Sequence, residues 1–223
     1  MDFSITILII AATSIVSFIA LNNEDLLNKL IFYPPAVTER NEWYRFFSSG
    51  IIHADFPHLI FNMYALYLFG TGVENRFIAI FGDKGRMLYL GMYVLALGVS
   101  LLPTYSKNKD NYHYRSLGAS GAVSAVVFAY MLFDPLMGVG LFFIPIFIAG
   151  FLFGILYLVI SHFLDKRGGG RINHSAHIWG ALFGLAFVIV ACRLFGGYPV
   201  LANFIETIKN LDPSKLITFG RGQ

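Results

Sequence analysis

The first residue in this chain whose setting suggests chemistry is Ser120, in the stretch "RSLGASGAVSA". Small, helix-compatible residues follow it, so the pattern predicts a helix that begins at the serine. The first N–H groups of a helix have no partner within it, and the helix dipole there favours negative charge. Gly118 and Gly121 allow close backbone approach on either side. A hydroxyl beside an oxyanion site suits acyl transfer, although small residues in an apolar helix also serve close helix packing.

Two further groups of polar residues favour the chemical interpretation. His58 and Asn62 are four positions apart and therefore share one face of a helix. His177 shares a face with Gly180 and Gly184, and such a surface of small residues lets a neighbouring helix pack closely. Serine, histidine and asparagine on three apolar segments together indicate a serine hydrolase. The helix that begins at the serine offers small residues against which the His177 face can pack, at Ala122, Ala125 and Ala129.

The composition is that of a membrane protein. Of 223 residues, 57% are hydrophobic and 13% are charged, whereas soluble domains carry about 25% charged residues. Several apolar stretches approach the ~20 residues that cross a bilayer as a helix, and two are shorter and contain polar groups. We expect an all-α membrane protein with one six-span domain, 1–198. Its spans are expected at about 3–21, 58–74, 87–105, 118–133, 141–164 and 174–195.

The fourth of these spans is too short to cross the membrane. It stops at Asp134, so the 14 residues from Ser120 to Phe133 extend about 21 Å in a hydrocarbon core ~30 Å thick. Ser120 should therefore lie well below one surface. Backbone that is not helical is tolerated at that depth only if it is buried in protein or faces a water-filled cavity. We expect residues from about 112 to 119 to line a wet pocket with the serine at its floor.

The rest of the chain restricts the possible structure and partners of the protein but adds no candidate catalytic residue. The tail, 199–223, has an apolar helical face over 199–211 that suits a helix lying on the membrane surface. Cys192 is the single cysteine, which excludes an intramolecular disulfide and a cysteine-based zinc cage. The net charge of +3 is spread through the loops, so we expect no nucleic-acid partner.

Taken in order, these motifs resemble those of the rhomboid intramembrane serine proteases over roughly residues 43–190. The resemblance implies the six-helix rhomboid bundle, with the shortened fourth span starting at mid-membrane. The matching motifs are His58 to Asn62 for H-x-x-x-N with His53 before it, Gly118 to Gly121 for G-x-S-G, Ala176 to Gly184 for A-H-x-x-G-x-x-x-G, Glu74 to Arg76 for E-x-R, and Trp43, Tyr44 and Arg45 for an aromatic-Arg element of the first loop.

The resemblance also implies roles for these residues. Ser120 would be the nucleophile and His177 the general base, as a dyad without a carboxylate. His58, Asn62 and the Ser120 N–H would form the oxyanion hole. Many relatives place a tyrosine one turn after the nucleophile, stacked on the catalytic histidine. Here that position is Ser124, so the ring must come from elsewhere or be missing. The remaining matches would be structural or supporting: Gly118, Gly121, His53, Glu74, Arg76, Gly180 and Gly184.

As a member of such a family, the protein would be a serine endopeptidase of the bacterial inner membrane that cleaves transmembrane segments of membrane proteins, with neither cofactor nor metal. The substrate helix would approach from the lipid past the fifth span, whose phenylalanines include Phe142 and Phe143. The loop 164–177, with its three glycines, would cover the pocket and move.

Other classes fit less well. No H-E-x-x-H motif is present, and aspartates lie only at the ends of the spans, which argues against zinc and aspartyl intramembrane proteases. A transporter would need a charged path across the membrane, and the expected spans provide none. The alternative that shares the scaffold is a catalytically silent rhomboid-like protein that binds transmembrane helices.

Overall fold

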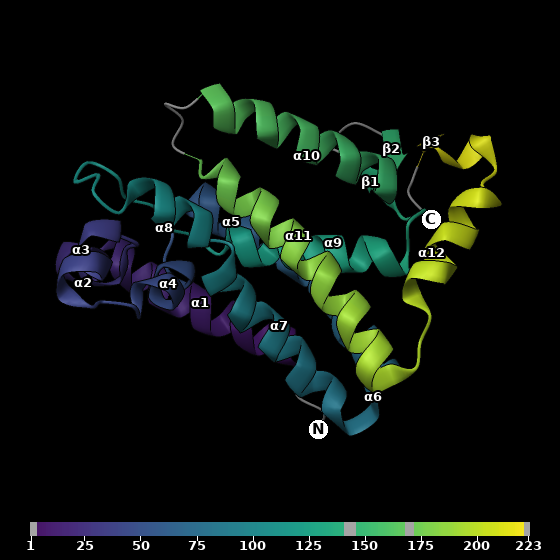
Figure 1. The fold of residues 1–223 in the computed structure, drawn as a ribbon, viewed down its shortest axis with the longest axis horizontal. Coiled ribbons are helices and arrows are strands. Elements are labelled where there is room, and N and C mark those ends of the chain that lie inside the picture. Colours follow the sequence, from purple (N-terminus) through teal and green to yellow (C-terminus); the bar gives the residue numbers. More distant parts are fainter. Residues whose placement is uncertain (1–3, 141–145, 168–171, 221–223) are drawn as a thin grey trace.

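The computed structural model describes residues 4–140, 146–167 and 172–220, most of which are helical (Figure 1). Short helices fill the loop after the first long helix, and longer apolar helices make up the body. The helices are α1 (Ile5–Leu21), α2 (Glu24–Leu30), α3 (Pro34–Arg40), α4 (Arg45–Ser48), α5 (Phe56–Ala65), α6 (Thr71–Phe81), α7 (Gly85–Val99), α8 (Leu102–Asn108), α9 (Ser120–Phe133), α10 (Gly150–Arg167), α11 (His174–Ala191) and α12 (Val200–Lys209).

Helices α9 and α11 form the centre of the molecule. In Figure 1, α11 crosses the middle with α9 beside it, α7 on one side and α10 on the other. Ten of the 14 residues of α9 are buried, most of them small or β-branched. The helix begins at Ser120 and ends at Phe133, as the sequence predicts, and so starts two residues after the beginning of the expected span, 118–133. Ser120, the first residue of this buried helix, is itself half-buried.

The first helix, α1, has its polar residues inside and its apolar residues outside. Thr6, Thr13 and Ser17 are buried, whereas Ile15 and Phe18 are about 60% exposed. This distribution is the reverse of that in a soluble protein, in which large apolar side chains are most often buried. It suits a helix whose outer face is in contact with lipid and whose small polar residues pack against neighbouring helices.

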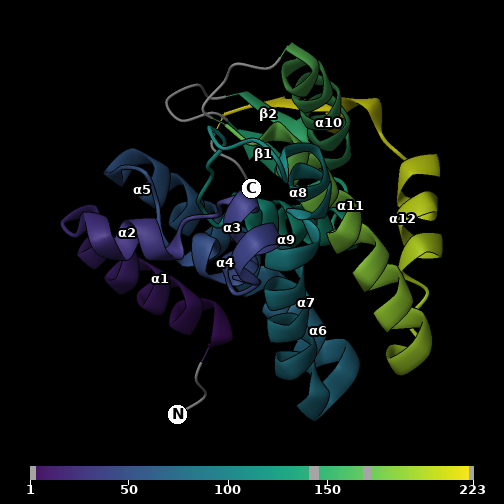
Figure 2. The same ribbon diagram turned by 60° about the vertical axis from the view of Figure 1, so that its left-hand side comes forward.

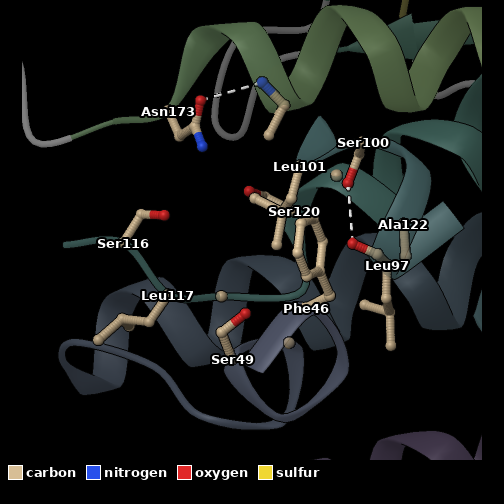
Figure 3. A pocket seen from close by; sticks show the side chains of 14 residues that line it. Phe46, Ser49, Leu97, Ser100, Leu101, Ser116, Leu117, Ser120, Ala122 and Asn173 are labelled. Atoms are coloured by element: carbon tan, nitrogen blue, oxygen red, sulfur yellow. Dashed lines mark hydrogen bonds between the residues drawn. The ribbon is translucent and has the colours of Figure 1, made fainter. Parts of the chain in front are cut away.

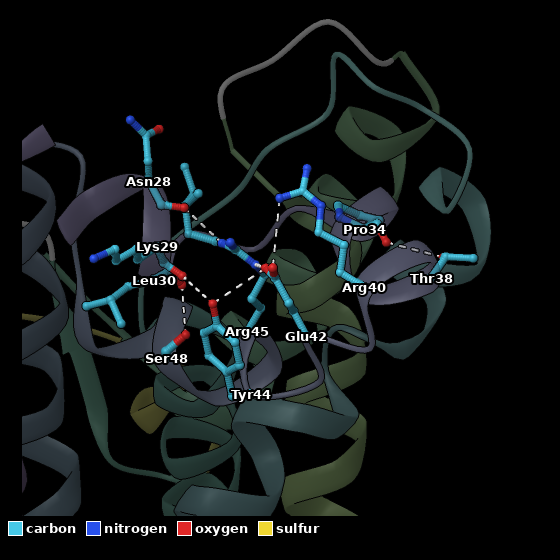
Figure 4. Close-up of polar contacts among 11 residues, drawn as sticks. Asn28, Lys29, Leu30, Pro34, Thr38, Arg40, Glu42, Tyr44, Arg45 and Ser48 are labelled. Atoms are coloured by element: carbon cyan, nitrogen blue, oxygen red, sulfur yellow. Dashed lines mark hydrogen bonds and ion pairs between the residues drawn. The ribbon is translucent and has the colours of Figure 1, made fainter. Parts of the chain in front are cut away.

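The loop between α1 and α5 is held by side chains of α4 and the residues before it (Figure 4). The last four carbonyls of a helix have no partner within it. At the end of α2, Arg45 Nη1 donates to the carbonyls of Asn28 (2.9 Å) and Ile31 (2.6 Å), and the Tyr44 hydroxyl donates to that of Lys29 (3.0 Å). The aromatic-Arg element thus caps α2 and fixes the loop.

The expected third span is shorter than predicted. The sequence predicts one helix over 87–105, but α7 ends at Val99 and a separate helix, α8, begins at Leu102. Pro103 explains the break, because it lacks an N–H and its ring would clash with the carbonyl four residues back, that of Val99.

The expected fifth span also begins later than predicted. We expected a helix from residue 141, but α10 begins at Gly150, and residues 141–145, with Phe142 and Phe143, lie outside the described residues. Ile146–Ala149 form a strand, β2, between β1 (Gly138–Gly140) and β3 (Ile217–Phe219) in an antiparallel sheet. The physical reason is that two flanking segments supply backbone partners for β-branched and aromatic residues. Figure 2 shows β3 reaching β2 from the tail that follows α12.

The other expected segments are helical with shifted bounds. The second extends to Phe81, because a π-helical turn, Leu66–Gly70, joins α5 to α6. The sixth ends in a second π-helical turn, Cys192–Gly196, and the expected tail helix is α12. Residue 3 of the first expected span lies outside the described residues.

By length and composition, two helical stretches of the described residues are apolar enough to cross a membrane: Phe56–Asn108, which runs over several helices, and His174–Gly196. Ile5–Leu21 and Ser120–Phe133 are shorter apolar helices. The count of six spans, and a fourth span that starts at mid-membrane, therefore stay predictions.

Candidate functional site

Ser120 and His177 lie within hydrogen-bonding distance of each other. The Oγ atom of Ser120, the first residue of α9, is 2.7 Å from Nε2 of His177, in the first turn of α11. Asn173 caps α11, because its Oδ1 accepts from the N–H of Ala176 at 3.0 Å and also from the Thr104 hydroxyl at 3.1 Å. The cap fixes the start of the helix that carries the histidine.

Small residues allow α9 and α11 to approach closely enough for this contact. A Cβ on Gly180 would overlap the carbonyl of Gly121, and one on Gly184 would overlap that of Ala125. The sequence predicts that the face of His177, Gly180 and Gly184 packs on α9, and this packing is confirmed. The two helices touch by backbone, so their spacing at the serine is set by the absence of side chains.

The segment before the serine is bound to the first loop. The backbones of Ser116 and Phe32 pair with each other, at 3.0 and 3.1 Å, and the N–H of Gly118 donates to the carbonyl of Ser49 at 2.9 Å. Gly118 has φ +114°, a conformation that side chains rarely adopt, and the His58 ring fills the space that its Cβ would need. Glycine is therefore required at 118 for both reasons.

His53 completes the attachment of this segment. Its Nε2 accepts from the N–H of Ala119 at 3.3 Å, so the proton of the neutral ring lies on Nδ1. From there it donates to the Ser17 hydroxyl at 2.9 Å, which donates to the Ile51 carbonyl at 3.0 Å. Burial lowers the pKa of His53, in the loop before α5, to about 3, so the ring stays neutral at physiological pH.

The two candidates for the oxyanion hole differ in position. The His58 ring lies against Gly118, edge-on to the His53 ring at a centroid distance of 5.0 Å. The side-chain nitrogen of Asn62, which is buried, donates to the His58 backbone carbonyl at 3.0 Å. An amide group has two N–H donors, so this bond leaves the second for another acceptor. The structure thus brings His58 to the segment that leads into Ser120, with Asn62 one helical turn further along.

A small cavity borders the serine (Figure 3). Its volume is about 20 Å³, room for about one water molecule. Of the segment expected to line a wet pocket, about 112–119, Ser116, Leu117 and Gly118 border this cavity. Asn173 borders it and also a larger cavity of about 350 Å³, which Lys107, Asp165 and His174 line as well.

Sequence reasoning missed an aromatic neighbour of His177. The ring of Tyr157, on α10, stacks on the imidazole with centroids 6.2 Å apart and planes at 19°. The His174 ring meets the same imidazole edge-on at 5.9 Å. A signal for His174 is its place three residues before His177, on the same helix face. Nothing in the sequence pairs residue 157 with 177.

Glu74 and Arg76 have no part in this arrangement. The Glu74 carboxylate accepts from the N–H groups of Ile5 and Thr6, at 2.7 and 3.0 Å, and so caps the start of α1. Arg76 is exposed. Among the described residues, no group of three or more His, Cys, Asp or Glu side chains gathers that could hold a metal ion.

Comparison with known proteins agrees with the family resemblance of the sequence. The model of the rhomboid domain matches residues 40–194. The chain is 28% identical to the rhomboid protease GlpG of Haemophilus influenzae over 84% of this chain and 91% of that protein. It is 30% identical to the mitochondrial RHOMBOID-like protein 12 of Arabidopsis thaliana over 60% of this chain and 42% of that protein. For the human mitochondrial presenilin-associated rhomboid-like protein the identity is 30%, over 63% of this chain and 36% of that protein. The chain therefore spans less than half the length of these two mitochondrial relatives.

Proposed function

The chain belongs to the rhomboid family, whose members are integral membrane proteins, and on that premise we propose that it is a serine endopeptidase that cleaves transmembrane segments. The observation that carries the proposal is the 2.7 Å contact between Ser120 Oγ and His177 Nε2 at the start of α9. Support at the level of the family comes from the similarity to a rhomboid protease over most of both chains.

The chemistry follows from this pair. The Ser120 hydroxyl attacks the scissile carbonyl while Nε2 of His177 takes its proton. When the carbon–nitrogen bond breaks, His177 gives that proton to the leaving amine, and the acyl group stays on Ser120 as an ester. A water molecule then attacks the ester and loses a proton to His177, which returns it to the serine oxygen. The cavity beside Ser120 has room for that water.

The negative charge of the tetrahedral intermediate needs donors near the serine. The N–H of Ser120, at the start of α9, is one of the backbone groups that a helix leaves without an internal partner. We assign His58 and Asn62 as the side-chain donors. Their support is the contact of His58 with Gly118 and the second N–H of the Asn62 amide. These three groups would act as the oxyanion hole.

The domain, 1–198, would cross the membrane six times, with the bilayer of a bacterial inner membrane as its location. The apolar outer face of α1 and the two long apolar stretches support a membrane setting. In this arrangement α9 is the short fourth span, and Ser120 lies below the surface. The cavities that Asn173 borders would bring water to it.

The partners of the protein would be the transmembrane helices of its substrates. A substrate would enter from the lipid at α10, where Ile155, Ile160 and Phe163 are more than half exposed and only three of 18 residues are buried. The expected lid, 164–177, includes residues 168–171, which lie outside the described residues.

The test is cleavage of a model transmembrane substrate by the purified protein in liposomes, together with labelling by a fluorophosphonate. Ser120→Ala and His177→Ala should each abolish both, because loss of one member of such a dyad is close to loss of both. Ser116→Ala is the matched control, since this serine lines the same cavity and should keep labelling. Labelling that survives in Ser120→Ala would refute the assignment. If the wild type binds transmembrane helices but neither cuts nor labels, the silent rhomboid-like alternative is correct.

A further inference from the structure

The aromatic support of His177 comes from an unexpected helix. The family resemblance places a tyrosine at the position of Ser124, on α9, whereas here Tyr157 on α10 stacks on the imidazole at 6.2 Å. The Tyr157 hydroxyl is 3.1 Å from the Ser124 hydroxyl. The serine that replaces the expected ring therefore binds the ring that takes its place.

Tyr157 is itself held in a defined orientation. The ring of Phe153, one turn earlier on α10, stacks on it at 6.2 Å and 29°. The ring of Phe128, on α9, meets it at 5.8 Å and 52°. Gly154 lets α10 approach α9 here, because its Cα faces Phe128 and an added Cβ would lie 3.3 Å from that ring. Two rings and one hydroxyl thus fix the face that Tyr157 presents to the imidazole.

We propose that Tyr157 is a positioning residue for His177, and that its origin on α10 makes the orientation of the base depend on the docking of α10 against α9 and α11. The proposal rests on the proposed protease function. Of the residues of α10, only Gly150, Gly154 and Ser161 are buried, so this helix lies at the edge of the described structure. A displacement of α10 would carry the ring away from His177 while Ser120 stayed in place on α9.

The size of the effect follows from aromatic stacking. A stacked pair of rings stabilises its arrangement enough that its loss corresponds to an about 2- to 13-fold change in rate. Because Tyr157 acts on His177 and not on the substrate, the loss should appear in kcat with KM unchanged.

The experiment compares ring-removing and ring-keeping variants in the liposome cleavage assay. Tyr157→Leu removes the ring but keeps most of the apolar volume, and it should lower kcat about 2- to 13-fold. Tyr157→Phe keeps the ring and its contacts with Phe153 and Phe128 but loses the hydroxyl contact with Ser124, so it should lower kcat less than Tyr157→Leu does. Moving the ring to α9, in the double variant Tyr157→Ala with Ser124→Tyr, should recover kcat relative to Tyr157→Ala alone. Phe195→Ala is the control, because it removes a ring that is 62% exposed, in the turn Cys192–Gly196 at the opposite end of α11 from His177.

Two results would overturn the proposal: wild-type kcat in Tyr157→Leu, or a double variant with native Tm whose kcat stays at the level of Tyr157→Ala. A second readout does not need activity. The NMR signal of the His177 ring in histidine-labelled protein, assigned with His177→Ala, should broaden in Tyr157→Leu and stay sharp in Phe195→Ala. An unchanged signal in Tyr157→Leu argues against positioning even if the protein proves to be no protease. Conversely, an inactive wild type whose His177 signal does broaden in Tyr157→Leu supports positioning and rejects only the protease function.

Discussion

Substitution of Gly180 by alanine tests whether helix spacing controls the dyad. A Cβ at this position would lie 2.8 Å from the carbonyl carbon and 3.1 Å from the Cα of Gly121. Carbon atoms in contact are about 3.5–4.0 Å apart, so α11 must move away from α9 by roughly 1 Å. That shift would lengthen the 2.7 Å contact of Ser120 and His177 beyond hydrogen-bonding distance.

Activity should fall much more than stability. A misplacement of about 1 Å in catalytic geometry costs about 10²-fold in rate. Overpacking costs about 1–3 kcal/mol in the free energy of unfolding, and replacing glycine with alanine in a helix offsets about 1 kcal/mol of that. Gly180→Ala should therefore lower kcat about 100-fold while its Tm in detergent falls only slightly.

Gly91→Ala is the matched control. Gly91 also lies inside an apolar helix, α7, but no atom lies within 4 Å of its added Cβ. This variant should keep wild-type kcat and be about 0.5–1 kcal/mol more stable, from helix propensity alone. Cleavage of the model transmembrane substrate and the rate of fluorophosphonate labelling measure the outcome. Wild-type kcat in Gly180→Ala would show that close contact of α9 and α11 does not set the dyad, and the packing argument would be wrong.

Four further predictions concern other parts of the molecule. Asn62→Ala should lower kcat by up to about 10²–10³-fold in the cleavage assay, the cost of one oxyanion donor, and an unchanged kcat would remove it from that role. Arg45→Ala should lower the free energy of unfolding by about 1–3 kcal/mol, seen as a lower Tm, because the buried carbonyl of Ile31, directly after α2, loses its donor. The pKa of His53 in the folded state is lowered to about 3, so as the pH falls the unfolded chain binds a proton at this histidine before the folded protein does. The free energy of unfolding should therefore fall by about 2 kcal/mol from pH 7 to pH 5. His53→Gln should flatten the dependence of Tm on pH, and an equal slope in both proteins would contradict this. Truncation after Leu211 removes β3 and Leu216, whose carbonyl accepts from the N–H of Ala149. Amide exchange at Ala149 should therefore accelerate, while fluorophosphonate labelling continues unchanged. If exchange at Ala149 stays slow in the truncated protein, the bond to residue 216 is not what protects this amide.

The features that the sequence determined by itself are local ones. The start of α9 at Ser120 and its end at Phe133 follow from the residues at its two ends. The shared face of His177, Gly180 and Gly184 follows from the 3.6-residue period, and small residues mark where two helices can touch. From these, the meeting of Ser120 with His177 was predictable, because backbone contact leaves few ways to pack such faces.

Other features were decided by the tertiary structure alone. The sequence did not show which residue, if any, supplies a ring beside His177. Only the packing of α10 placed Tyr157 there, because stacking depends on the rotation and height of one helix relative to another. The strand β2 was predicted as helix, because its apolar residues suit either structure until β1 and β3 supply backbone partners from distant parts of the chain. The bonds of Arg45 to the carbonyls of Asn28 and Ile31 could not be predicted either, because main-chain carbonyls carry no sequence signal. In each case the deciding partner is far away in sequence or is backbone, and a pattern of side-chain types records neither.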